Sequence, residues 1–134
     1  SDSGFIFQLY GFAYIREMEL LREAGFHPLE VIRAATLSGA ETLKMDDKIG
    51  TIEVGKFADM VLVDSNPLEN LKVLYGTGAI KLNENNEVVR VGGIKYTISN
   101  GVIYDAKGLL NEVKMMVDKA KEEEGFEIKQ PGVN

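Results

Sequence analysis

The sequence predicts an α+β domain in which helices come first, a small and mostly antiparallel sheet follows, and one more helix comes last. Two patterns predict this order. Apolar residues recur at helical spacing before Met45, and short β-branched segments separated by turn residues come after it. With 134 residues, the chain is too short for a complete (β/α)8 barrel, which takes about 250 residues. The chain is therefore expected to act as one domain or as part of something larger.

Three helices are expected in the first third of the chain. From Phe5 to Ala24, apolar residues recur every three or four positions with charged residues between them, and Gly25 is expected to end this helix. Pro28 suits the first position of a second helix of about eight residues. Ser38 and Glu41 fit a capping box, in which each side chain satisfies one backbone N–H, so the third helix is expected to begin at Ser38.

The middle of the chain is expected to form strands. The run from Ala58 to Asp64 is almost continuously apolar between two acids, which is typical of a buried strand, and Asn66-Pro67 is expected to turn the chain after it. Asn100-Gly101 between two apolar runs is a strong hairpin signal, because both residues tolerate a positive φ. The four other expected strands are Ala79 to Leu82, Val88 to Val91, Ile94 to Ile98 and Val102 to Tyr104.

The last periodic stretch predicts a helix on the surface. Leu110, Val113, Val117 and Ala120 share one face, and charged residues occupy the other. The segment from Gly125 to Asn134 has little to bury and is expected to be a loosely held end.

The composition excludes several classes of function. Asp and Glu number 21 against 15 Lys and Arg, a net charge of −6, which argues against a nucleic-acid partner. The absence of cysteine removes disulfides and thiolate metal sites and suits the cytoplasm. No apolar run approaches the roughly 20 residues that span a bilayer, so no membrane partner is expected.

Two residues are candidates for chemistry. His27 is the only histidine, and because a catalytic zinc site needs about three protein ligands, its position before Pro28 favours a surface or helix-capping role. Asp2 lies in the small segment Ser1-Asp2-Ser3-Gly4 before an amphipathic helix. Such a segment suits a loop at the catalytic face of a barrel enzyme, and equally suits a helix N-cap. The paired glycines at 76–78 and 92–93 are expected to be turns, because neither precedes a helix or carries the lysine of a phosphate-binding loop.

Several stretches together resemble one family. They are the segment 1–4, the helical pair 19–36, the segment 49–64 with its Gly-Lys-Phe-Ala-Asp-Met-Val run, Asn66-Pro67-Leu68, and the hairpin 98–104. In this order they resemble the C-terminal third of metal-dependent amidohydrolases, in the branch that includes imidazolonepropionase and prolidase-like enzymes. The resemblance implies the end of a (β/α)8 barrel over residues 1–48, part of a small β-sandwich over 49–105, and a C-terminal helix with a loose tail over 106–134.

The resemblance also implies a mechanism. In such enzymes one or two divalent metals, commonly zinc, activate a water that attacks a C–N bond, amide or peptide, in a small substrate. The Asp after the eighth strand ligates metal and moves the proton from water to the leaving nitrogen, and in this sequence that role falls on Asp2. The family's metal-binding histidines and lysine have no counterpart in this sequence and would lie upstream of Ser1. The chain is therefore expected to be a fragment that is inactive alone and binds no metal alone.

Other interpretations remain open. The chain is expected to associate, as a homo-oligomer or through the apolar surface that a missing barrel would leave exposed. The alternative to the enzyme is a non-catalytic α+β module that binds a partner through its helical face. In a third interpretation, a separate chain supplies the rest of the barrel, and Asp2 still does chemistry in the complex.

Overall fold

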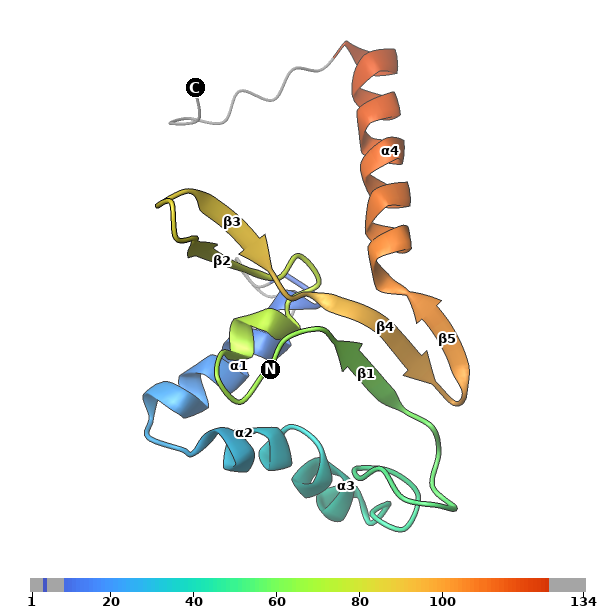
Figure 1. The fold of residues 1–134 in the computed structure, drawn as a ribbon. Coiled ribbons are helices and arrows are strands. Elements are labelled where there is room, and N and C mark those ends of the chain that lie inside the picture. The colour runs from blue at the N-terminus through green and yellow to red at the C-terminus, as the bar shows by residue number, and fades with distance from the viewer. Residues whose placement is uncertain (1–3, 5–8, 126–134) are drawn as a thin grey trace.

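The structure, a computed structural model, describes Gly4 and residues 9–125. Helices come first, strands follow, and a helix comes last, so the expected order is confirmed (Figure 1). The elements are α1 (Phe12–Glu23), α2 (Pro28–Ala34), α3 (Leu37–Leu43), β1 (Met60–Val63), the 3-10 helix η1 (Leu71–Leu74), β2 (Ala79–Leu82), β3 (Val88–Val91), β4 (Ile94–Ser99), β5 (Val102–Asp105) and α4 (Ala106–Glu124).

The first two helices form largely as their local sequence predicts. Gly25 ends α1 as expected, with a φ of 99° and its N–H bonded to the Arg22 carbonyl at 3.0 Å. Pro28 is the first residue of α2. The start of α1 differs from the expectation: the helix begins at Phe12. Residues 5–8, which are also expected to be helical, lie outside the described part of the chain.

The third helix does not begin with the expected capping box. It starts at Leu37, and Ser38 lies inside it, where the Ser38 carbonyl accepts a hydrogen bond from Thr42 Oγ1 at 2.8 Å. The Glu41 carboxylate does not reach back to the helix start, because it forms an ion pair with Arg33 Nη2 on α2 at 2.7 Å. A charge on the preceding helix therefore takes the carboxylate that the capping box would need.

The strands form two sheets, and every strand pair in the described residues is antiparallel. One sheet has the order β1-β4-β5, and β2 and β3 form the other. The predicted hairpin is confirmed: Asn100 and Gly101 connect β4 to β5 with φ angles of 48° and 80°. Gly76 and Thr77 lie in a turn before β2, as expected, whereas Gly92 and Gly93 form the two-residue connection between β3 and β4.

The expectation of a fully buried strand at β1 is wrong. Val61 is 48% exposed and Leu62 is 42% exposed. An apolar run is buried on both faces only when other layers cover both faces. In this fold β1 is an edge strand paired to β4 alone, and of its four residues only Val63 packs against the main core.

The core lies on the helical side of the molecule. The cluster joins α1, α2 and η1, and its buried members are Ile15, Met18, Val31, Leu71 and Leu74. The last helix lies apart from this core: α4 leaves the end of β5, extends away from the rest of the molecule, and contains no buried residue (Figure 1). No helix between residues 9 and 125 is both long enough and apolar enough to cross a membrane.

Candidate functional site

The residue that the sequence singles out for catalysis, Asp2, lies outside the described residues, so its role stays a prediction. Gly4, two positions later, is described; its φ is 92° and the Tyr10 ring lies against it. Within the described residues, no three His, Cys, Asp or Glu side chains form a group that could hold a metal ion. This part of the chain alone therefore does not supply a metal site.

His27 is a capping residue, as its position before Pro28 suggests. Its Nδ1 accepts a hydrogen bond from the Leu29 N–H at 3.4 Å, and its own N–H donates to Glu30 Oε2 at 2.7 Å. These two bonds satisfy backbone N–H groups at the start of α2. The imidazole is thus engaged in the structure of the helix.

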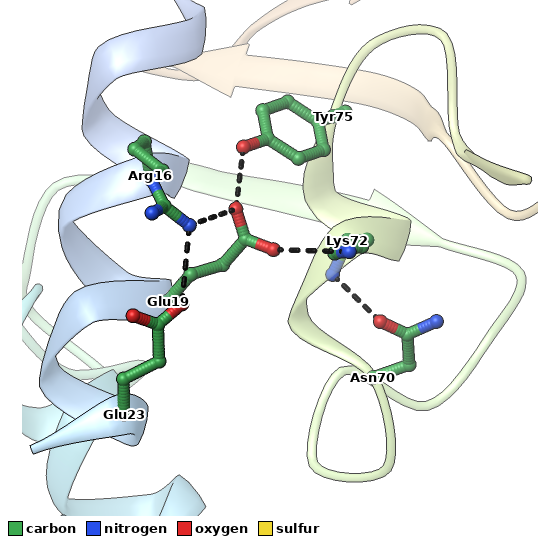
Figure 2. Close-up of polar contacts among 6 residues, drawn as sticks. All are labelled: Arg16, Glu19, Glu23, Asn70, Lys72 and Tyr75. Atoms are coloured by element: carbon green, nitrogen blue, oxygen red, sulfur yellow. Dashed lines mark hydrogen bonds and ion pairs between the residues drawn. The ribbon is translucent and has the colours of Figure 1, made fainter.

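The most connected polar side chain described is Glu19, which links α1 to η1 (Figure 2). Its Oε2 accepts a hydrogen bond from the Tyr75 hydroxyl at 2.7 Å, and its Oε1 lies 3.7 Å from Lys72 Nζ. Arg16 Nη1 lies 3.9 Å from Glu19 and 3.2 Å from Glu23. Only 13% of the Glu19 side chain is exposed, so its carboxylate is largely shielded from water, whereas the side chains of its cationic partners Arg16 and Lys72 are 54% and 61% exposed.

The Glu19 cluster acts as a structural clamp between α1 and η1. Burial, with the hydrogen bond to Glu19 and the negative charge of Glu19, raises the pKa of Tyr75 to about 12. A phenol with that pKa keeps its proton at neutral pH and is a poor acid catalyst there. The Phe12 ring packs 5.7 Å from the Tyr75 ring, which adds apolar contact to the same junction. The cluster therefore fixes η1 on α1.

Sequence reasoning missed the Glu19 cluster. The helical spacing of Arg16, Glu19 and Glu23 places them on one side of α1, which a sequence can show. The partner Tyr75 lies 56 positions away, and no local pattern marks it.

An apolar cavity of about 300 Å³ lies beside the core, where α1, α2, η1, β1 and β4 meet. Across it, the Tyr14 hydroxyl donates a hydrogen bond to the Ala35 carbonyl, and burial raises the pKa of Tyr14. It has few polar groups to orient a ligand, so it resembles an uncovered packing surface more than a reaction site. Residues that line it include Tyr14, Met18, Ile32, Val61, Val63 and Pro67.

The Gly-Lys part of the segment that resembles the family forms a tight polar turn. Thr51 Oγ1 donates to Glu53 Oε1 at 2.6 Å, and Lys56 Nζ donates to Thr51 Oγ1 at 2.5 Å. The hydrogen bond from Thr51 and then the charge of Lys56 lower the pKa of Glu53. The Lys56 side chain is only 12% exposed, so its ammonium is committed to this turn.

The Ala-Asp part of the same segment holds the hairpin. Asp59 Oδ1 accepts a hydrogen bond from the Asn100 N–H at 2.6 Å, and the Ala58 carbonyl accepts one from the Gly101 N–H at 3.1 Å. Both bonds connect the chain before β1 to the turn between β4 and β5. Lys56 and Asp59 therefore stabilise the fold. The motif that contains them is thus a structural signal.

Comparison with known proteins supports the family resemblance of this segment. The amidohydrolase family matches residues 2–104. The chain belongs to the amidohydrolase family. It is similar to an imidazolonepropionase of Caldanaerobacter subterraneus subsp. tengcongensis, with 36% identity over 63% of this chain, and to an adenine deaminase of Rhizobium meliloti, with 30% identity over 50% of this chain. The chain covers 18% and 11% of the lengths of these two relatives.

Two solved structures are also similar to this chain. A protein from Bifidobacterium longum assigned as a prolidase superposes with a TM-score of 0.62 and 31% identity, over 84% of this chain and 26% of that protein. A Xaa-Pro dipeptidase with methionine bound in its active site superposes with a TM-score of 0.57 and 28% identity, over 73% of this chain and 20% of that enzyme. The family match and these two neighbours fit an α/β fold with sheets, and the family match ends before α4 begins at Ala106.

Proposed function

We propose that the chain forms the C-terminal part of a metal-dependent amidohydrolase that hydrolyses a C–N bond, amide or peptide, in a small substrate in the cytoplasm. Residues 1–48 end the barrel, residues 49–105 contribute to a β-sandwich, and residues 106–134 follow as a helix and tail. The match of the amidohydrolase family to residues 2–104 carries the proposal. The names of the relatives, a deaminase, an imidazolonepropionase and a dipeptidase, support chemistry at C–N bonds.

The exposed apolar surface supports a larger assembly. Val61 and Leu62 on β1 and the cavity beside α1 lack a covering layer in the described residues. Contiguous uncovered apolar surface marks an interface. In the proposed enzyme the remaining barrel and sandwich cover these faces, and the isolated chain associates through them.

Asp2 is the proposed catalytic residue and metal ligand. Its carboxylate takes the proton of the attacking water and passes it to the leaving nitrogen. A divalent metal, commonly zinc in such enzymes, is held largely by residues of the parent protein outside this sequence. Proton transfer at Asp2 is the step that this sequence would contribute to the proposed reaction.

The test compares the longest natural polypeptide that contains this sequence with the 134-residue chain. We expect the longer protein to hydrolyse members of a panel of dipeptides and N-acyl compounds with zinc present. Asp2→Asn should lower its kcat by at least about 100-fold, because general acid–base catalysis contributes that much or more. Asp59→Asn is the matched control, since Asp59 holds the hairpin, and it should leave kcat within about twofold.

The 134-residue chain alone is expected to be inactive and to bind no zinc stoichiometrically by elemental analysis. Zinc-dependent hydrolysis by the chain alone would contradict the proposed division of the site. If Asp2→Asn retains full kcat in the longer protein, Asp2 is a helix cap. If no longer polypeptide exists and the chain folds without metal, the non-catalytic α+β module is the correct interpretation.

A further inference from the structure

The last helix has no role in the proposed reaction. The amidohydrolase family match stops at residue 104, two positions before α4 begins at Ala106. The helix has 19 residues, so it is about 28 Å long, and none of them is buried. Most of its length extends away from the sheets (Figure 1). Most of the stability of a helix in a protein comes from packing an amphipathic face against a partner.

One side of α4 carries an apolar stripe with the spacing of a two-helix seam. Leu109, Val113 and Met116 follow one another at intervals of four and three, and they are 49%, 56% and 70% exposed. Ala106 and Ala120 extend the stripe at seven-residue steps from Val113. Such alternating spacing is what two helices need to interlock side chains along their length.

We propose that α4 pairs with α4 of a second copy of this chain in an antiparallel coiled coil. The register places Val113 opposite Met116 of the second copy, and Leu109 opposite Ala120. In this register Glu112 and Lys119 flank the seam, and each lies beside the oppositely charged residue of the other copy. The two-fold symmetry of a homodimer makes this ion pair twice.

Charge at the helix ends selects the antiparallel direction. A parallel pair would bring two Glu122–Glu124 triplets to the same end, where six carboxylates repel one another. The antiparallel pair places each triplet beside the first turn of the other helix, near its Lys107 and the positive end of its dipole. Lys119 is free to take part, because its existing pair with Glu123 at 3.6 Å is a weak, exposed one.

Cysteine crosslinking tests both contact and direction, since the natural sequence has no cysteine. Leu109→Cys and Ala120→Cys are prepared as two separate variants of the full chain. Under mild oxidation we expect a covalent dimer only when the two are mixed. Two copies of position 109 in the antiparallel pair are offset by eleven residues, about 16 Å along the axis, which is too far for a disulfide.

Each other outcome overturns the proposal. Parallel pairing gives a covalent dimer from either variant alone, and association only through the sheet or the cavity gives no preference for the mixture. Two consecutive methionines provide a matched pair for measurements in solution. Met116 lies in the seam, and Met115, which is 64% exposed, lies on the side of the helix away from the seam. Met116→Glu should raise the dimer Kd by at least about tenfold in sedimentation equilibrium, and Met115→Glu should leave it within about twofold.

A charge exchange completes the test. Glu112→Lys and Lys119→Glu should each weaken the dimer, and the double variant should recover the original Kd because the ion pair is restored with its charges reversed. A double variant as weak as either single one would contradict the register.

Discussion

The helical side and the sheet side of the molecule hold together in different ways. Five buried side chains from α1, α2 and η1 form the main cluster, whereas β1, β4, β5 and α4 contribute no buried residue to the described structure. Each strand is nevertheless paired with at least one neighbour, and β4 is hydrogen-bonded on both edges. Backbone hydrogen bonds between strands can therefore organise a sheet even when no other layer packs on its faces. Helices have no backbone hydrogen bonds to one another, so their arrangement depends on side-chain packing.

The largest expected effect tests this contrast directly. Leu71→Ala removes a side chain that is 7% exposed in the core cluster, and should lower the free energy of unfolding by about 2–5 kcal/mol. Leu62→Ala removes the same atoms from β1, where the side chain is 42% exposed, and should cost about 1 kcal/mol or less. Urea unfolding of the two variants measures the difference. Equal losses would show that the sheet side is packed as tightly as the helical side.

The second prediction concerns two glycines in the segment that joins the two sides. Gly50 and Gly55 have similar φ angles, 93° and 97°, but a Cβ at Gly50 would lie 2.7 Å from the Ala40 Cβ on α3, and one at Gly55 would meet open space. Gly55→Ala should cost about 1 kcal/mol of backbone strain. Gly50→Ala should cost about 2–4 kcal/mol, because overpacking adds to the same strain. Thermal unfolding compares them, and similar Tm values would mean that α3 does not pack on this segment.

Local signals in the sequence predicted the strands, the hairpin turn and the end of α1. Each depends on a few neighbouring residues, such as Asn100-Gly101 or Gly25, whose backbone preferences depend little on distant parts of the chain. The predictions that failed depend on distant groups. Ser38 does not cap α3 because Arg33 binds Glu41, and β1 is not buried because burial depends on layers that the strand itself does not encode.

The candidate site shows the same limit. The capping role of His27 follows from its neighbours Pro28 and Glu30, and it was predictable. The Glu19–Tyr75 contact joins residues that are 56 positions apart, so no periodic pattern announces it. Asp2 was singled out by resemblance to a family, and its role stays a prediction because it lies outside the described residues.

The third prediction examines what holds the sheet side. Asp59→Ala removes the acceptor of the Asn100 N–H and should cost about 1–1.5 kcal/mol, since a charge-assisted hydrogen bond is lost at the turn. Asp64→Ala is the control on the same sheet. Its carboxylate lies 3.6 Å from Lys95 and from Lys107, but all three are about half exposed, so the loss should stay below about 0.5–1 kcal/mol. Amide hydrogen exchange at Asn100 reports the Asp59 effect locally, and unchanged protection there would refute the contact.

The last prediction concerns the clamp between α1 and η1 on the helical side, whose pH dependence appears only at high pH. Because the pKa of Tyr75 is raised from 10.0 to about 12, the folded state favours the neutral phenol. The stability that this shift gives to the folded state is fully present below pH 10. It is lost as the pH rises through about 12, so the urea midpoint of the natural chain should fall over this window. Tyr75→Phe should remove that part of the pH dependence, and Glu19→Gln should move the loss to lower pH, because it removes the charge that helps raise the pKa. Ultraviolet absorbance of tyrosinate follows the ionisation itself. If the Phe variant shows the same fall as the natural chain, the ionisation of Tyr75 does not contribute to it, and the predicted role of its hydroxyl in the clamp is wrong.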